Sequence, residues 1–155
     1  MNNIKFFLIL SLLFLFSMNT ASAGDLDSGG WVSNSSVVNG LPSVNNPTPT
    51  VFYYNDVWKL ISGNNAGTFT GYNWTGTTWQ VDSDIISGLG DIGTFSAPAV
   101  FNDGGTLKLI AGDGPGNFFG FYWSGSAWIP DSSIVSGLVD VGDRSTLTVF
   151  YDSGT

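Results

Sequence analysis

Hydrophobic and polar residues alternate along this chain in short segments. Runs of Val, Ile, Thr, Tyr, Phe and Trp are separated by clusters of Gly, Asn, Asp and Ser, a pattern typical of β-strands joined by turns. The clearest stretch predicts four strands, at residues 99–102, 106–111, 117–123 and 126–130. Tight turns are expected between them, at 103–105, 112–116 and 124–125. We therefore predict an all-β protein, with no helix in the mature chain.

The same pattern occurs earlier in the chain. Residues 116–128, GNFFGFYWSGSAW, match residues 67–79, GTFTGYNWTGTTW, which lie 49 positions before them. Aromatic residues that recur at one position of a repeat usually fill the space between neighbouring sheets. This predicts a structural role for five repeated aromatics, namely Trp31, Trp79, Trp128, Phe69 and Phe118. Phe69 and Phe118 each precede a Gly by two positions, so ring and bare backbone share a face, and we expect the next sheet to approach closely there.

Four strands in each period of about 49 residues indicate the blades of a β-propeller. The predicted partial propeller, residues 24–155, contains a fourth-strand segment at 30–34, blades at 50–81 and 99–130, and the start of another blade at 148–155. Since these strands do not close a ring, we expect an N-terminal piece of a longer protein, with further blades in cis. The alternative is a short subunit that builds its ring from several copies.

The N-terminal residues have the features of a signal peptide. Lys5 precedes an apolar run from Phe6 to Phe16, and Ala21-Ser22-Ala23 fits a signal-peptidase site, which predicts cleavage before Gly24. An uncleaved membrane anchor is the alternative. We expect a secreted or cell-surface protein with no membrane insertion after cleavage of residues 1–23. The sequence has no cysteine, so no disulfide supports the fold.

The mature chain is strongly acidic. After residue 23 it contains twelve Asp against Lys59, Lys108 and Arg144, a formal charge of −9. Binding to nucleic acid depends on Lys and Arg, so we expect no nucleic-acid partner. The simplest interpretation of the acidity is solubility outside the cell.

Residues 91–101, DIGTFSAPAVF, and 107–118, LKLIAGDGPGNF, resemble the FG-GAP and VCBS class of propeller repeats, to which integrin α-chain heads are related. The resemblance covers most of residues 31–155 and implies an extracellular adhesion role. In that family the loop between the first two strands carries an Asp-rich calcium site. The loops here, at 55–56, 102–105 and 152–154, have one carboxylate each, so we interpret them as hairpin turns and predict no metal.

Catalytic chemistry has few candidate residues in this sequence. The mature chain has no His, Cys or Glu, which removes the usual bases for a nucleophile. Asp82 and Asp84 are the nearest to a carboxylate pair, but Asp84 is replaced by Ser133 in the next repeat. Residues 76–79, GTTW, resemble the end of the Asp-box of sialidase-like propellers, although Trp74 replaces its Asp. We predict a protein that is not an enzyme and needs no cofactor.

Aromatic side chains are the best candidates for a binding site. The candidate ligand-binding residues, on the two repeated third strands, are Tyr72, Asn73, Trp74, Phe121, Tyr122 and Trp123. They suit stacking on sugar rings or anchoring a protein loop, although core packing is the alternative for each.

Asn34 and Asn73 begin glycosylation sequons. The predicted function is noncatalytic binding or adhesion to an extracellular protein or glycan. The alternatives are a lectin assembled from short subunits and an enzyme with its catalytic residues in other blades.

Overall fold

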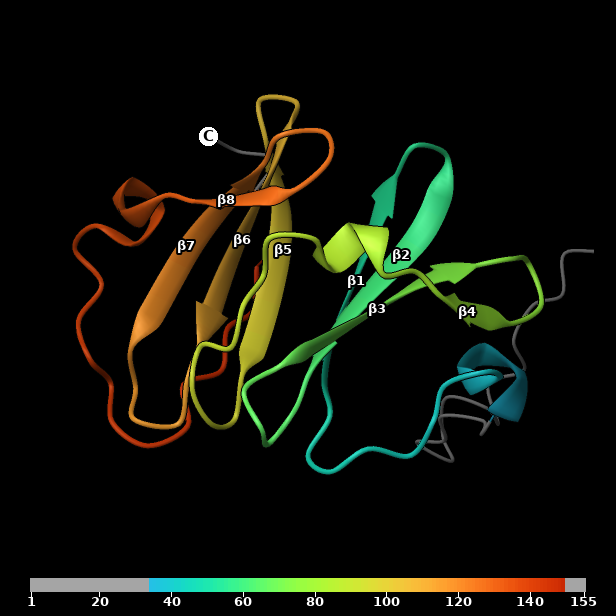
Figure 1. The fold of residues 1–155 in the computed structure, drawn as a ribbon, viewed down its shortest axis with the longest axis horizontal. Coiled ribbons are helices and arrows are strands. Elements are labelled where there is room, and N and C mark those ends of the chain that lie inside the picture. Colours follow the sequence, from blue (N-terminus) through green and yellow to red (C-terminus); the bar gives the residue numbers. More distant parts are fainter. Residues whose placement is uncertain (1–33, 150–155) are drawn as a thin grey trace, which may run out of the picture. The chain divides into compact units, whose positions relative to one another are not determined.

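The computed structural model describes residues 34–149 and contains two four-stranded antiparallel sheets (Figure 1). The first sheet consists of β1 (Thr48–Tyr54), β2 (Val57–Gly63), β3 (Phe69–Trp74) and β4 (Trp79–Val81). The second consists of β5 (Ala97–Asp103), β6 (Thr106–Gly112), β7 (Phe118–Trp123) and β8 (Trp128–Pro130). Strands that follow one another in the chain are neighbours in each sheet. The prediction of an all-β chain is confirmed.

Each strand of the second sheet begins and ends 49 positions after its counterpart in the first. The hydrogen-bonding register is also shared, since Leu60 faces Tyr72 as Leu109 faces Phe121. The predicted strand at 126–130 is shorter, because Ser124 and Ala127 close a turn with paired backbone and hydroxyl hydrogen bonds. β8 therefore begins at Trp128.

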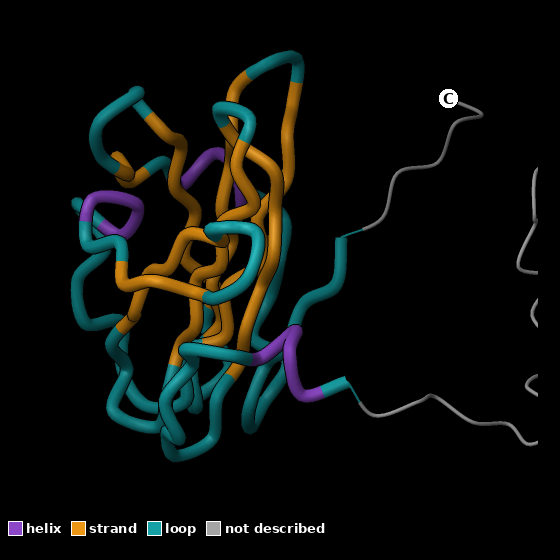
Figure 2. The backbone as a smooth tube through the Cα atoms, turned by 90° about the vertical axis from the view of Figure 1, so that its right-hand side faces the viewer, coloured by secondary structure: helices purple, strands orange, loops and turns teal. Residues whose placement is uncertain are grey.

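The expectation of no helix was wrong in detail, since residues 34–149 contain three single-turn 3-10 helices. They are η1 (Ser35–Val38), η2 (Asp84–Ile86) and η3 (Ser132–Val135), drawn in purple in Figure 2. The side chains of Asn34 and Asp131 accept hydrogen bonds from the backbone N–H groups of Ser36 and Ser133, which caps η1 and η3. No helix in residues 34–149 has the length and apolar character needed to cross a membrane.

Several predicted segments lie outside the described residues. The signal peptide at 1–23 and most of the strand expected at 30–34 precede them, and Asn34 itself is a helix cap rather than a strand residue. Of the strand expected to start the next blade, Thr148 and Val149 are described and are not in a strand.

Each sheet has two faces that take part in different contacts. We call the face that carries Trp79 or Trp128 the upstream face, and the face that carries Phe69 or Phe118 the downstream face. Phe52, Ile61 and Phe69 on the downstream face of the first sheet belong to the same buried cluster as upstream residues of the second sheet. These upstream residues are Leu107, Leu109, Ala111, Phe121 and Trp128. The main core of the described chain therefore lies between the sheets.

The glycines on β3 and β7 have a different role from the one expected. A side chain at Gly71 would collide with the Asp82 carbonyl oxygen and with Ile85, and one at Gly120 would collide with the Asp131 carbonyl oxygen. The segment after the fourth strand therefore occupies this close approach, rather than a strand of the next sheet. The bare backbone of Gly71 makes room for Ile85, which enters the core between the sheets.

A repeated contact joins each sheet to the segment before it. The indole N–H of Trp79 donates to the Val37 carbonyl at 2.9 Å, and its backbone N–H donates to the Asn39 carbonyl at 2.8 Å. Trp128 makes the same two bonds, to the Ile85 carbonyl at 2.7 Å and the Ser87 carbonyl at 2.8 Å. We call this pair of carbonyls, together with the Gly that follows it, the carbonyl clamp. It fixes the fourth strand of each sheet against the preceding 3-10 helix.

Candidate functional site

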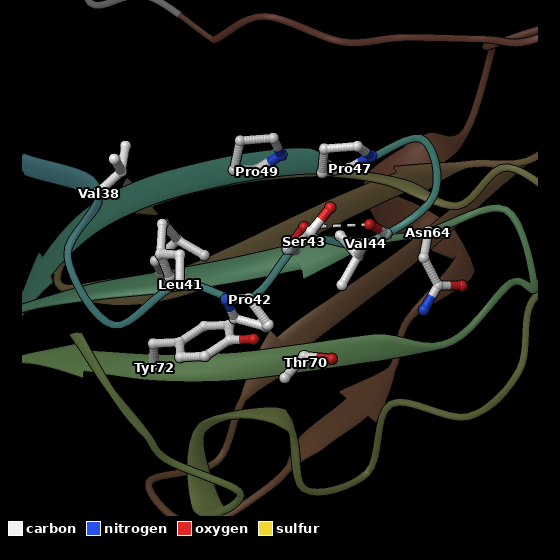
Figure 3. Close-up of a pocket in the computed structure, with 13 residues that line it drawn as sticks. Val38, Leu41, Pro42, Ser43, Val44, Pro47, Pro49, Asn64, Thr70 and Tyr72 are labelled. Carbon is white, nitrogen blue, oxygen red and sulfur yellow. Dashed lines mark hydrogen bonds between the residues drawn. The ribbon is translucent and has the colours of Figure 1, made fainter. Parts of the chain in front are cut away.

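A pocket of about 400 Å³ lies between the upstream face of the first sheet and the chain segment that precedes it (Figure 3). Its floor is formed by β1, β2 and β3, and its cover by residues 38–47. The lining residues are Val38, Leu41, Pro42, Ser43, Val44, Pro47, Pro49, Leu60, Ser62, Gly63, Asn64, Thr70 and Tyr72. None of these side chains is charged, so the pocket is neutral and mostly apolar.

The local sequence explains how the walls are held apart. Ser62 pairs with Thr70, and Leu60 pairs with Tyr72, so all four side chains lie on one face of the sheet. The covering segment contains prolines at 42 and 47, which favour extended backbone and prevent its collapse into a helix. Leu41 packs against the small cluster of buried residues on this face, which consists of Leu60, Tyr72 and Trp79.

Hydroxyl groups provide most of the polar chemistry of the pocket. Tyr72 is only 3% exposed, and burial raises the pKa of its hydroxyl above the ordinary value of 10.0, against the opposing effect of a hydrogen bond with Thr70. The phenol is therefore neutral at physiological pH and is able both to donate and to accept. The Asn64 side chain instead holds its own turn, because its oxygen accepts from the backbone N–H groups of Ala66 and Thr68.

The equivalent surface of the second sheet shows what is unusual about the first. The positions of Ser62, Thr70 and Tyr72 are occupied there by Ala111, Phe119 and Phe121, and the face is packed against the first sheet. A hydroxyl without a partner is unfavourable in such an apolar contact. The upstream face of the first sheet is thus equipped for polar contacts, whereas its counterpart is equipped for packing.

A second hollow, about 360 Å³ in volume, lies further along the same face. It is lined by Val37, Val51, Trp58, Trp74 and Trp79, and we call it the tryptophan groove. Trp58 is 50% exposed, and the rings of Trp74 and Trp79 lie 5.2 Å apart between centroids. Exposed aromatic surface of this kind is suited to stacking.

The six candidate ligand-binding residues do not come together in one site. Tyr72 and Phe121 are buried in separate clusters. Trp74 lines the tryptophan groove, while its counterpart Trp123 lies between the sheets and donates its indole N–H to the Tyr54 hydroxyl at 3.0 Å. Asn73 and Tyr122 are on the downstream faces. Alternation along a strand separates neighbours such as Tyr72 and Asn73 onto opposite sides of the sheet.

The predicted structural aromatics are mostly enclosed. Phe69, Trp79 and Trp128 are buried, Phe118 is half-buried, and Trp31 lies outside the described residues. Sequence reasoning did not select Trp58, Ser62 or Thr70. The sequence did contain a signal for them. Each differs in size or polarity from the residue 49 positions later, in the same way that Asn73 differs from Tyr122.

Several acidic residues in the described part of the chain have structural partners. Asp82 forms an ion pair with Lys59 at 2.6 Å and accepts a hydrogen bond from the backbone of Asp84. Hydrogen bonds from the hydroxyl and the backbone N–H of Ser133 hold the pKa of Asp131 below its usual value. Buried Asp113 accepts from the backbone N–H groups of two turn residues. Within residues 34–149, no group of three or more His, Cys, Asp or Glu is placed to hold a metal ion.

The loops compared with calcium sites are turns where the structure describes them. Asn55 and Asp56 connect β1 to β2 with φ angles of 50° and 61°, and Gly104 and Gly105 connect β5 to β6 with φ angles of 58° and 94°. Left-handed φ at both central positions suits a two-residue hairpin.

Comparisons of the chain with protein-family models, curated proteins and solved structures find no match. The resemblance to FG-GAP and VCBS repeats stays a prediction from the quoted residues.

Proposed function

We propose that this chain is a segment of a secreted or cell-surface β-propeller that acts as a noncatalytic binding module for a neutral saccharide. The blade assignment is supported by two sheets with equal strand order, strand bounds offset by 49 residues, and one sheet packed face to face on the next. Further blades, in cis or from other subunits, complete the ring.

The observation that carries the saccharide proposal is the set of hydroxyl groups in the pocket. Ser62, Thr70 and Tyr72 replace Ala and two Phe of the equivalent packed surface, and they surround an uncharged space of about 400 Å³. This volume is within the range of about 300–1,000 Å³ that is usual for small-molecule sites. Mixed hydroxyl and apolar walls match the hydroxyl and C–H faces of a sugar ring. The acidic charge of the chain disfavours anionic sugars.

A glycan array probed with the secreted chain tests this proposal, followed by calorimetric titration with the best neutral sugar. We expect saturable binding that is lost in Thr70→Phe, because the ring present at the equivalent position of the second sheet then fills the pocket. Thr77→Phe is the matched control, since Thr77 is exposed in the turn between β3 and β4. Saturable binding that survives Thr70→Phe would place the sugar elsewhere and contradict this site.

Adhesion to a protein is the second candidate, and the tryptophan groove is the observation that favours it. An apolar loop of a partner protein fits a surface built from Val51, Trp58 and Trp74. Capture of a cell-surface protein that is abolished by Trp58→Ser, together with no response on the glycan array, would support adhesion in place of saccharide binding.

A further inference from the structure

The carbonyl clamp occurs three times in the described chain, and two copies are filled. The first copy binds Trp79, and the second binds Trp128. The contact is close, because a side chain at Gly40 would collide with the Trp79 carbonyl oxygen and one at Gly88 with the Trp128 carbonyl oxygen. Each clamp therefore requires glycine, which has φ of 86° at the first position and 85° at the second.

The third clamp has the same backbone conformation, but no tryptophan within residues 34–149 binds it. η3 is followed by Ser136 and Gly137, and Gly137 has φ of 88° with no atom of the described chain near its missing side chain. The carbonyls of Ile134 and Ser136 occupy the positions of the acceptors in the filled clamps, and no hydrogen bond from residues 34–149 reaches them. Leu138 is 48% exposed, whereas its counterpart Leu89 packs against the core between the sheets. The third clamp is thus formed, and no described residue fills it.

The sequence contains a third segment of the kind that fills a clamp. Trp31 begins the residues WVSNSSVVNGL, which correspond to WQVDSDIISGL from Trp79 and WIPDSSIVSGL from Trp128. In both described cases this Trp is the first residue of the fourth strand, β4 or β8. We propose that Trp31 of one copy of this chain binds the third clamp, at Ile134, Ser136 and Gly137, of a second copy.

The distance along the chain favours a second copy over the same one. Trp31 is three residues before Asn34, which caps η1, and three residues span at most about 11 Å. η1 contributes Val37 to the groove on the upstream face of the first sheet, whereas η3 packs at Gly120 on the downstream face of the second. Two packed sheets, each about 10 Å deep, separate these positions.

This contact joins two different surfaces, so it is a head-to-tail interface. Such interfaces produce rings when the rotation between copies closes and open chains when it does not. Apolar residues beside the third clamp extend the contact area. Phe101, Ile110 and Phe118 on the downstream face of the second sheet correspond to Phe52, Ile61 and Phe69, which form the contact between the sheets within one chain.

Sedimentation velocity of the secreted chain over a concentration series tests the proposal with two single variants. Trp31→Ala removes the inserted side chain. Gly137→Asn adds a side chain that obstructs docking, while Asn tolerates the left-handed backbone there. The matched control is Gly142→Asn, because Gly142 has φ of 85° and also has open space beside it, but is not part of a clamp.

We expect the unmodified chain and Gly142→Asn to associate with increasing concentration, and each of the other two variants to associate at least about tenfold more weakly. An equimolar mixture of Trp31→Ala and Gly137→Asn should recover dimers and nothing larger, because only one functional junction is possible per pair. Trp31→Phe, which keeps a ring but loses the indole N–H, should lie between the unmodified chain and Trp31→Ala.

Three results would overturn the proposal. They are a monomer at every concentration, association that both single variants leave unchanged, and a mixture that stays monomeric. Circular dichroism of each variant checks that the sheets are intact. The sugar titration of the pocket is independent of this contact, so failure of one proposal leaves the other standing.

Discussion

The upstream faces of the two sheets have equivalent backbones and different surroundings. In the second sheet this face is covered by the first sheet and carries Leu109, Phe119 and Phe121. In the first sheet it is covered in part by residues 38–47 and carries Leu60, Thr70 and Tyr72. The backbone pattern therefore sets where the side chains point, and the segment packed against a face determines which side chains suit that face. Polar residues are tolerated on the face that borders a pocket.

The sharpest test of this comparison is to replace each of the two tryptophans that are bound by a carbonyl clamp. Trp128 is 1% exposed and lies between the sheets, so Trp128→Ala should lower the free energy of unfolding by about 3–5 kcal/mol. Trp79→Ala should cost less, because Trp79 borders the open tryptophan groove. Urea unfolding followed by circular dichroism measures both. Equal losses in the two variants would show that cover by a neighbouring sheet adds nothing to the stability contributed by the tryptophan.

A hydrogen bond between the sheets should have a smaller effect. Tyr54→Phe removes the acceptor of the Trp123 indole N–H, and we expect a loss of about 1 kcal/mol in the free energy of unfolding. Tyr53→Phe is the control, since Tyr53 is exposed on the opposite face of β1. The same urea titration applies. A loss in Tyr53→Phe as large as that in Tyr54→Phe would contradict the assignment.

The buried Tyr72 hydroxyl predicts a pH-dependent difference between the two sheets. Because the folded pKa is raised, the unfolded chain ionises first, so the stability contributed by the neutral phenol is complete below pH 10.0 and is lost as the pH rises through the folded pKa. Tyr72→Phe copies the second sheet at this position and should remove this component. The measurement is the thermal midpoint of the wild type minus that of the variant, taken at each pH across this range. The other titrating groups are the same in both proteins, so their contributions cancel in this difference. A difference that does not change with pH would refute the prediction.

The smallest expected change is at the tryptophan groove. Trp58→Leu copies Leu107 of the second sheet, but Trp58 is half exposed, so the free energy of unfolding should change by no more than about 0.5 kcal/mol. Leu107→Ala, at the buried counterpart, should cost at least about 2 kcal/mol. A large loss in Trp58→Leu would mean that the groove is a packed surface.

Local sequence was a good guide to the strands and turns. β6 and β7 were predicted to within one residue at each end, because β-branched and aromatic runs stop at Gly, Asn or Asp residues that need turn geometry. The 3-10 helices were missed, since the capping side chains of Asn34 and Asp131 resemble ordinary turn residues. The role of Gly71 was also missed. A glycine in a strand indicates that another segment packs closely against the backbone, but the sequence does not show which segment this is.

The candidate site was much less predictable than the strands. Tyr72 and Trp74 were selected for their aromatic rings, and both lie on the surface that contains the pocket and the groove. The rings of Phe121 and Trp123 were selected for the same reason and are enclosed between the sheets. A ring that binds and a ring that packs have the same chemistry, so the sequence of one strand does not distinguish them.

The sequence by itself determined the all-β character, the strand positions of the second sheet to within two residues, and the offset of 49 residues between equivalent strands, because turn propensity and side-chain alternation act over a few neighbouring positions. Only the tertiary structure decided which face of each sheet is covered, that residues 38–47 cover a pocket, and that a tryptophan is held by carbonyls 40 or more residues away. These features depend on which segments meet in space, and burial assigns different roles to chemically equivalent side chains.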